Sequence, residues 1–576
     1  MRGDEGTRLE VWGGIECSHV QIGDMIRDQL REQGHWWRPR DLDRVAALGI
    51  RRLRMPVLWG AIAAQGKPDF RWPDRRFARA RALGIDPIAG LLHHGWGPGG
   101  MTPLDDRFTA AFAAYAGAVA RRYPWIRDYT PVNEPVTTAR FAGLYSVWHP
   151  HGRDEATFLR LTFGAIEATV AAMAAIRRHR PDARLIQTED VGRTFAAPEL
   201  ADQANYENAR RFLGFDLLCG RVDRDHPFHA RLLRAGIAEA RIKALADAPC
   251  PPDIIGIDHY LTSDRWLDPD LSAHPHHRPG GNGRQVYVDI AAAHMPHLHP
   301  RIGVLQRLRE AHARYRLPLA ITENHNGCTR EEQLRWLMEG WTAARQARAE
   351  GVDVRAVTSW ALFGAYDWNS LLCDRTGFYE SGAFDLRHRP PRLTAVGQAV
   401  AALARHGHWD HPVLEAQGWW RDAPTPDDPL LTVAAPEAWH AGLRALADVR
   451  RLPLRIMPPL TSARMAVAES RLGALHLAVD GHGLRFSWFR DGRERLSVLA
   501  EAVTDPARDT ALHAVFDLVL DRTEGAFRLS KLQEGGQYRI LCLSAPARHR
   551  SGSGGLSRPA RRRDHTDSPS HADLGS

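Results

Sequence analysis

The chain has 576 residues, of which 44% are hydrophobic and 25% charged, and this indicates a globular protein with one large domain and a smaller one. Its formal net charge of +8 comes almost wholly from arginines spread along the chain, which argues against a nucleic-acid-binding surface. The six cysteines are scattered without a CxxC pair, and the N-terminal residues lack the apolar core of a signal peptide. We therefore expect a cytoplasmic protein that binds neither nucleic acid nor membrane. The sequence leaves its oligomeric state open.

Short, β-rich apolar runs alternate with longer amphipathic stretches through the first part of the chain. The runs predicted to be strands start at Leu9, Ile50, Asp86, Asp128, Arg184, Asp253, Pro318 and Ala356. Helical patterns cover residues 40–49, 107–123 and 330–351, and Thr329 with Glu332 forms a capping box at the start of the last one. This alternation predicts an α/β fold, a (β/α)8 TIM barrel of parallel strands. An open, doubly wound sheet is the alternative, because periodicity alone does not distinguish the two.

Polar side chains gather where the predicted strands end, which is where a barrel of this kind places its chemistry. They are His93, His94, Asn133, Glu134, Glu189, Asp258, Tyr260, Glu323 and Trp360. Glycoside hydrolysis needs one carboxylic acid to protonate the leaving oxygen and one carboxylate to attack or to activate water. Glu134 and Glu323, each at the end of an apolar strand, fit this pair. The alternative is that both glutamates only form ion pairs with neighbouring arginines.

Several motifs occur in the order in which one enzyme family has them. "VNEP" (132–135) resembles the acid/base motif of family 1 glycoside hydrolases, and "ITEN" (321–324) resembles their nucleophile motif. "GIDHY" (256–260) is similar to the family's "GINYY", "SWALFGAYDW" (359–368) to "WSLLDNFEW", "RMPVLW" (54–59) to "RFSISW", and "LLHHG" (91–95) to "LYHWD". The resemblance covers roughly residues 9 to 405, and the ordered set is specific where a single motif would be weak.

The resemblance implies a retaining β-glycosidase that acts on a small-molecule glycoside or oligosaccharide without a metal or cofactor. Glu134 would be the acid/base and Glu323 the nucleophile, with Tyr260 orienting Glu323 and Arg54 keeping it ionised. The resemblance also implies three substrate-binding residues: Asn133 at the sugar's 2-hydroxyl, His93 at another hydroxyl, and Trp360 as the platform under the ring.

The sequence departs from the family at several positions that hold the sugar. The family's first sugar-binding Gln aligns with Val20, with Gln21 one place off and Glu16 nearby. The Asn of "GINYY" is Asp258, and the Glu of "EW" is Asp367, one methylene shorter, followed by Trp368. We include Gln21, Asp258, Asp367 and Trp368 among the predicted substrate-binding residues, but these departures put glucose as the substrate in doubt. They also support an alternative, a catalytically silent or weak sugar-binding barrel, possibly fused to a degenerate sugar-nucleotide reductase-like region.

The remaining patterns predict loops and a second domain. "GWGPGG" (95–100) matches GxGxxG, but no helix follows it, so we interpret it as a loop at the rim of the site. The histidine-rich segments 272–281 and 294–300 lack metal-ligand spacing and are interpreted as surface loop. We predict a barrel at 1–408, a linker at 409–429, a C-terminal α+β region at 430–545 with a hairpin turning at 480–483, and a disordered tail at 546–576.

Overall fold

A computed structural model of the chain describes residues 8–64, 66–275, 277–421, 428–461, 464–465, 468–480, 483–500, 510–521 and 540–542. The predicted tail (546–576) and most of the reductase-like segment (518–530) lie outside the described residues.

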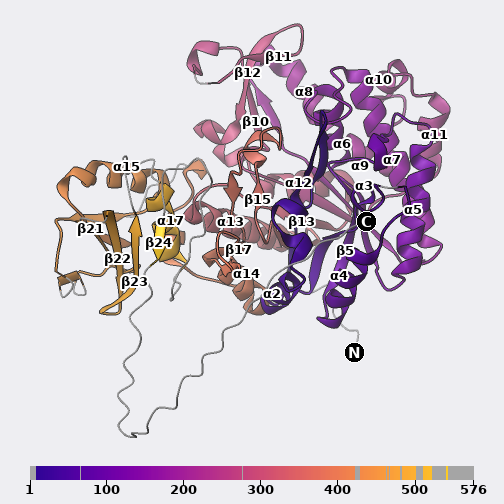
Figure 1. Ribbon diagram of the computed structural model, residues 1–576. Coiled ribbons are helices and arrows are strands. Elements are labelled where there is room, and N and C mark those ends of the chain that lie inside the picture. The colour runs from indigo at the N-terminus through magenta and orange to yellow at the C-terminus, as the bar shows by residue number, and fades with distance from the viewer. Residues whose placement is uncertain are drawn as a thin grey trace, which may run out of the picture.

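Eight parallel strands form a closed barrel, so the open-sheet alternative is excluded (Figure 1). The strand order around the barrel is β1-β14-β13-β9-β7-β6-β5-β4. All eight strands overlap the predicted apolar runs, and β14 starts two residues before its predicted start at Ala356. The strands are β1 Glu10–Gly14, β4 Arg52–Pro56, β5 Asp86–His93, β6 Asp128–Asn133, β7 Arg184–Asp190, β9 Ile254–Asp258, β13 Leu319–Asn324 and β14 Val354–Ser359. The near-continuous apolar character of these runs follows from burial on both faces of a parallel sheet.

Helices surround the barrel and bury its outer face. They include α2 Asp41–Ala47, α4 Arg71–Ala82, α5 Phe108–Arg122, α7 Glu155–Arg177, α12 Val304–Tyr315, α13 Arg330–Ala349 and α14 Ala395–His406. The predicted capping box at the start of α13 is confirmed, since the side chains of Thr329 and Glu332 each accept a backbone N–H of the other. By length and composition α7 could span a membrane, but 72% of its apolar window is buried against the rest of the fold.

The segment that follows β9 contains more regular structure than we predicted. It contributes three strands to a small sheet of order β11-β12-β10-β8, which projects beyond the barrel (Figure 1). These three strands are β10 Arg265–Asp268, β11 Gly280–Gly281 and β12 Val286–Ala291, and the fourth strand of the sheet, β8 Thr194–Ala196, comes from the segment before β9. The two histidine-rich segments predicted as surface loop are mostly exposed, and the buried apolar residues of β12 come from "VYVDIA" between them, for which we predicted no strand. Within the described residues no cluster of three or more His, Cys, Asp or Glu could hold a metal ion.

A second sheet lies beside the barrel and has its own apolar core (Figure 1). We call its described residues, between 428 and 542, the C-terminal unit. Its strand order is β20-β19-β21-β22-β23-β24, and helices α15 His440–Arg450 and α17 Thr510–Leu520 belong to it. The strands are β19 Leu431–Ala434, β20 Leu454–Met457, β21 Ala474–Asp480, β22 Gly483–Arg490, β23 Arg493–Ala500 and β24 Ile540–Cys542. The predicted hairpin is confirmed, with Asp480 opposite Gly483.

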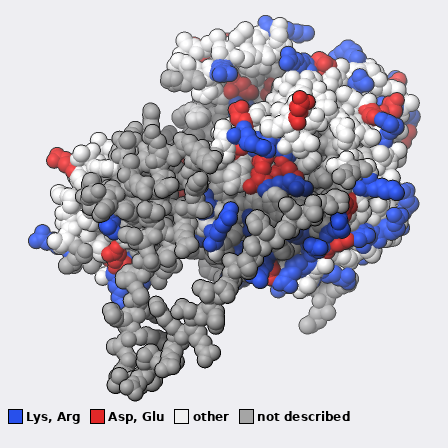
Figure 2. Space-filling model, in the orientation of Figure 1, with Lys and Arg blue, Asp and Glu red and all other residues white. Residues whose placement is uncertain are grey.

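The segment between the two bodies packs against the barrel. Two short 3-10 helices, η9 Pro412–Glu415 and η10 Trp419–Arg421, lie in it, and Trp420 is almost fully buried. The indole N–H groups of Trp419 and Trp420 donate to Glu332 and Glu339 of α13, both at 2.8 Å. On the molecular face in Figure 2, arginines and carboxylates are interspersed over the barrel.

Candidate active site

A cavity of about 390 Å³ opens at the carboxyl ends of the barrel strands, and we call it the mouth cavity. Five of the predicted site residues line it: Glu134, Tyr260, Glu323, Trp360 and Trp368. These residues are far apart in the sequence and meet here because parallel strands in a barrel end on the same side. The lining also contains residues that we did not predict, of which Glu16, Asp190 and Glu380 carry carboxylates.

Glu323 lies at the end of β13 and is held by two donors. Nη1 of Arg54, from β4, donates to Oε1 of Glu323 at 2.7 Å, and the Tyr260 hydroxyl donates to Oε2. Nη2 of Arg54 donates to Oδ1 of Asn133 at 2.5 Å, so the guanidinium joins the ends of β13 and β6. Burial raises the pKa of Glu323, while Arg54 and Tyr260 act in the opposite direction by stabilising the anion. The predicted contacts of Arg54 and Tyr260 with Glu323 are confirmed.

Glu134 follows β6 and has a left-handed backbone conformation, with φ +44°. Helix α6, Pro135–Ala139, starts directly after it, but a different carboxylate caps that helix. Glu189, from β7, accepts the backbone N–H groups of Val136 at 2.7 Å and Thr137 at 3.1 Å. Because Glu189 satisfies these donors, the Glu134 carboxyl is left to face the cavity. Glu189 is therefore a positioning residue.

The surroundings of Glu134 favour its protonated form. Among the described residues its one ion-pair contact is with His94, whose Nε2 lies 3.5 Å from Oε2. Burial and the charge of Arg54 lower the pKa of His94 to about 3, so this histidine is neutral near pH 7. Burial raises the pKa of Glu134 well above its ordinary value, and the anions of Asp258 and Glu323 raise it further. The two glutamates thus have opposite environments: Glu323 has a cation at contact distance and Glu134 has none among the described residues.

Three predicted substrate-binding residues have a buried N–H or ring nitrogen without a hydrogen-bond partner among the described residues. They are His93 Nε2, Asn133 Nδ2 and Trp368 Nε1. His93 and Asn133 are neighbours at the ends of β5 and β6, and the His93 ring stacks on Trp360 at 5.5 Å between centroids. Burial keeps the pKa of His93 well below its ordinary value. Unsatisfied buried polar groups are costly, and sugar hydroxyls are suitable partners for these three.

Five predicted substrate-binding residues do not line the mouth cavity: His93 and Asn133, described above, and Gln21, Asp258 and Asp367. The Gln21 amide, on β2 (His19–Ile22), donates to the carbonyl oxygen of Gly23 at 3.0 Å. Asp258 is fully buried behind the lining, where its Oδ1 accepts the Thr322 hydroxyl at 2.6 Å. The predicted substrate contacts of Gln21 and Asp258 are therefore not seen.

Asp367 is also turned away from the cavity. Its Oδ2 pairs with the buried Arg27 at 2.8 Å, and its Oδ1 accepts the Thr376 hydroxyl and the Phe378 N–H, each at 2.8 Å. The expectation that Asp367 contacts the sugar is corrected here, because Arg27 and the Phe378 segment take up both carboxylate oxygens.

Glu16 is the principal residue that the sequence analysis did not assign to the site. It follows β1, is 2% exposed, and lines the mouth cavity. The signal was a carboxylate just past an apolar strand end, the same signal that identified Glu134 and Glu323. The structure also adds a pair at the rim, His325 and Glu380, whose Nε2 and Oε2 lie 3.0 Å apart.

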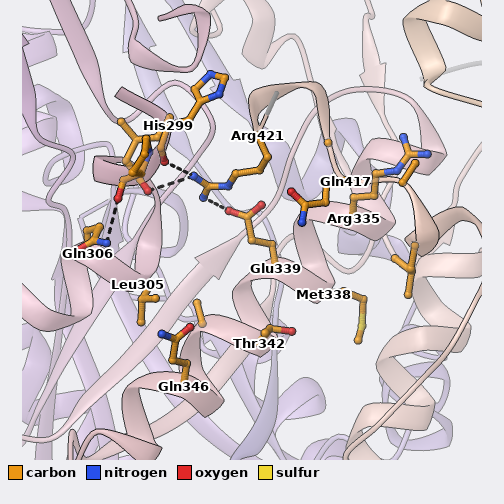
Figure 3. Close-up of a pocket in the computed structure, with 16 residues that line it drawn as sticks. His299, Leu305, Gln306, Arg335, Met338, Glu339, Thr342, Gln346, Gln417 and Arg421 are labelled. Carbon is orange, nitrogen blue, oxygen red and sulfur yellow. Dashed lines mark hydrogen bonds and ion pairs between the residues drawn. The ribbon is translucent and has the colours of Figure 1, made fainter. Parts of the chain in front are cut away.

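A second cavity, of about 550 Å³, lies outside the barrel between α12, α13 and the 412–421 segment (Figure 3). Its lining carries a single carboxylate, Glu339, which forms an ion pair with Arg421. A site with one carboxylate, already paired, does not supply the acid and the nucleophile that glycoside hydrolysis needs. The mouth cavity is therefore the candidate active site.

Comparison with known proteins agrees with this geometry. Residues 32–395 match the model of glycosyl hydrolase family 1, which is more than half of the chain. The chain belongs to glycosyl hydrolase family 1. Beta-glucosidase 47 of Arabidopsis thaliana is 24% identical over 438 residues, which cover 68% of this chain and 79% of the relative. The aryl-phospho-beta-D-glucosidase BglC of Bacillus subtilis (strain 168) is 22% identical over 391 residues, 59% of this chain and 79% of the relative.

Comparison with solved structures gives the same fold. The β-glucosidase from Thermotoga maritima in complex with cyclophellitol superposes with a TM-score of 0.55 at 16% identity, covering 71% of this chain and 100% of that one. This likeness shows the shared barrel fold. Together with family membership it makes the chain a retaining β-glycosidase, and nothing in the comparisons favours the silent-barrel alternative.

Proposed function

We propose that Glu323 is the nucleophile and Glu134 the acid/base in the retaining hydrolysis of a β-linked glycoside. The observation that carries this assignment is their opposite environment within one cavity. Arg54 and Tyr260 both donate to Glu323 and stabilise its anion, whereas Glu134 is buried without a cation among the described residues. A pair of carboxyls whose pKa values are driven apart by their surroundings is what acid and nucleophile roles require.

The reaction takes two steps. In the first, an Oε of Glu323 attacks the anomeric carbon, the glycosidic C–O bond breaks, and Glu134 gives its proton to the departing oxygen. In the second, the ionised Glu134 takes a proton from water as that water attacks the same carbon and releases Glu323. Arg54 remains paired with Glu323 and Asn133, so both strand ends stay aligned through the cycle.

A mechanism-based label tests this assignment. We expect an activated 2-deoxy-2-fluoro β-glycoside to form a stable adduct on Glu323, located by peptide mass spectrometry. Proton NMR of a fresh hydrolysis of an aryl β-glycoside should show the β-anomer of the product first. The variant Glu323→Gln should take no label, whereas Glu199→Gln, an exposed carboxylate remote from the cavity, should be labelled like the wild type. Labelling of another residue, or the α-anomer appearing first, would overturn the assignment.

A further inference from the structure

The position of Glu16 suggests that the mouth cavity holds a third functional carboxylate. Its Oε1 accepts the Ser18 N–H at 2.8 Å and the Ser18 hydroxyl at 2.5 Å. The N–H of the Trp368 indole acts on the same carboxyl group and lowers its pKa, against the larger effect of burial. Ser18 therefore holds Oε1 of Glu16, and the carboxyl group faces Trp368 and the cavity.

The residues that the family resemblance assigned to the sugar's outer hydroxyls are used elsewhere. Asp367 forms an ion pair with Arg27, and the Gln21 amide donates to the carbonyl oxygen of Gly23. Trp368, the residue after Asp367, does reach the cavity, and its Nε1 lacks a hydrogen-bond partner within the described residues. Glu16 and Trp368 therefore place a carboxyl group and an indole N–H donor side by side at the cavity, a combination that suits the hydroxyl groups of a sugar.

The charges around the cavity restrict the sugar further. Five carboxylates line it, Glu16, Glu134, Asp190, Glu323 and Glu380, and no lysine or arginine is among its lining residues. The guanidinium of Arg54, which contacts the lining residue Glu323, already donates to Glu323, to the Thr322 carbonyl and to Asn133. A phosphorylated sugar brings a charge of about −1.5 to −2 and needs cationic donors, which this lining does not offer.

We infer that Glu16 is the specificity-determining residue of this β-glycosidase, accepting hydrogen bonds from the outer hydroxyls of an unphosphorylated sugar in place of Asp367. The inference rests on the proposed function, because it assigns Glu16 to the sugar that Glu134 and Glu323 cleave. It also separates this chain from its relative BglC, which is named for phosphorylated β-glucosides.

The test measures kcat/KM for wild type and Glu16→Gln on aryl β-D-glucoside, its 4-deoxy and 6-deoxy analogues, and aryl 6-phospho-β-D-glucoside. We expect wild type to prefer the unphosphorylated glucoside over the phosphorylated one by about 10³-fold or more. At pH 8, above the pKa of about 7 to which burial raises Glu16, Glu16→Gln should lower kcat/KM on the glucoside by about 10- to 100-fold, as expected when bonds to a charged acceptor are lost. The ratio of kcat/KM on the unphosphorylated glucoside to kcat/KM on the phosphorylated one should be smaller in Glu16→Gln than in wild type, because the variant lacks one carboxylate that repels the phosphate.

The deoxy sugars distinguish a direct contact from a structural effect. The loss caused by Glu16→Gln should shrink towards onefold on the analogue that lacks the contacted hydroxyl, whereas a merely structural role would give the same loss on every sugar. An equal loss on all sugars, no loss at all, or efficient cleavage of the phosphorylated glucoside by wild type would overturn the inference.

Labelling by the 2-fluoro sugar keeps the two proposals distinguishable. If Glu323 is labelled in both wild type and Glu16→Gln while the deoxy series shows no selective effect, the assignment of Glu16 fails and the catalytic pair stands. If wild type is neither labelled nor active on any of these glycosides, the proposed function fails and the role of Glu16 fails with it.

Discussion

The mouth of the barrel and the contact between the barrel and the C-terminal unit both bury carboxylates, but their partners differ. At the contact, Arg330 and Glu331 of α13 meet residues of the C-terminal unit. Arg330 pairs with Asp521 at 2.9 Å, and Glu331 pairs with Arg450 at 2.6 Å, with all four side chains almost fully buried. At the mouth, only Glu323 has an arginine at contact distance among the described residues.

This difference teaches how to distinguish a structural carboxylate from a chemical one. Burial without a counter-charge favours the neutral carboxyl, which can then give up a proton or accept a ligand. Burial beside an arginine gives the carboxylate an ion-pair partner and joins two bodies, as at Glu331 and Asp521. Glu323 combines both features, because it is paired with Arg54 and still lines the cavity. Substitution of Glu by Gln should therefore lower activity at the mouth and lower the stability of the fold at the contact.

The largest effect is expected from Glu323→Gln. Loss of the nucleophile should lower kcat on aryl β-glycosides on the order of 10⁴-fold or more, because no covalent intermediate forms. Steady-state kinetics measures the loss, and thermal unfolding by circular dichroism should show that the variant is folded. Activity within tenfold of wild type would mean that Glu323 belongs with the structural carboxylates.

Glu134→Gln should lower kcat by about 10²- to 10⁴-fold on substrates with poor leaving groups, because these need proton donation. Since burial raises the pKa of Glu134 well above its ordinary value, the acid is protonated at neutral pH. Wild-type activity should then fall as the pH rises through that pKa, and this basic limb should be absent in Glu134→Gln. A pH–rate profile on an aryl and an alkyl glycoside checks both points. An unchanged basic limb would identify another proton donor.

Glu331→Gln should leave the chemistry intact and weaken the fold. Removing Glu331 leaves the buried Arg450 with the longer contact to Asp517, at 3.3 Å, as its remaining ion pair, so the free energy of unfolding should fall by up to about 3–5 kcal/mol. Chemical denaturation measures the loss, and active-site titration with the fluorosugar should give the wild-type kcat per folded molecule. A loss of kcat without a loss of stability would contradict the contrast drawn between the two regions.

The sequence predicted the barrel strands and the residues at their ends better than the contacts of the individual side chains around the cavity. Eight apolar runs were sufficient to place the strands, and strand-end position identified Glu134, Glu323 and Tyr260, because burial in a parallel barrel leaves a clear pattern. Asp367 was assigned by its motif, but its role depends on Arg27, which is distant in the sequence and has no motif of its own. Glu16 matched no motif, so only the three-dimensional cavity relates it to Trp368.

The smallest effect concerns the stability cost of Glu16 itself. Burial raises the pKa of Glu16 from 4.5 to about 7, against the hydrogen bonds from Ser18 and with the help of the Glu323 anion. Between these two values the unfolded chain has lost the proton and the folded chain keeps it, so rising pH favours unfolding across this window. Each unit of pKa difference corresponds to about 1.4 kcal/mol, so the free energy of unfolding of wild type should fall by up to about 3 kcal/mol across this window. Glu16→Gln does not titrate at this position and should not show that loss. Denaturation at pH 4.5 and pH 8 should therefore show the variant gaining stability over wild type only at the higher pH, while Glu199→Gln shows no such trend. A difference between variant and wild type that is independent of pH would mean that Glu16 is already ionised in the fold, as a structural carboxylate would be.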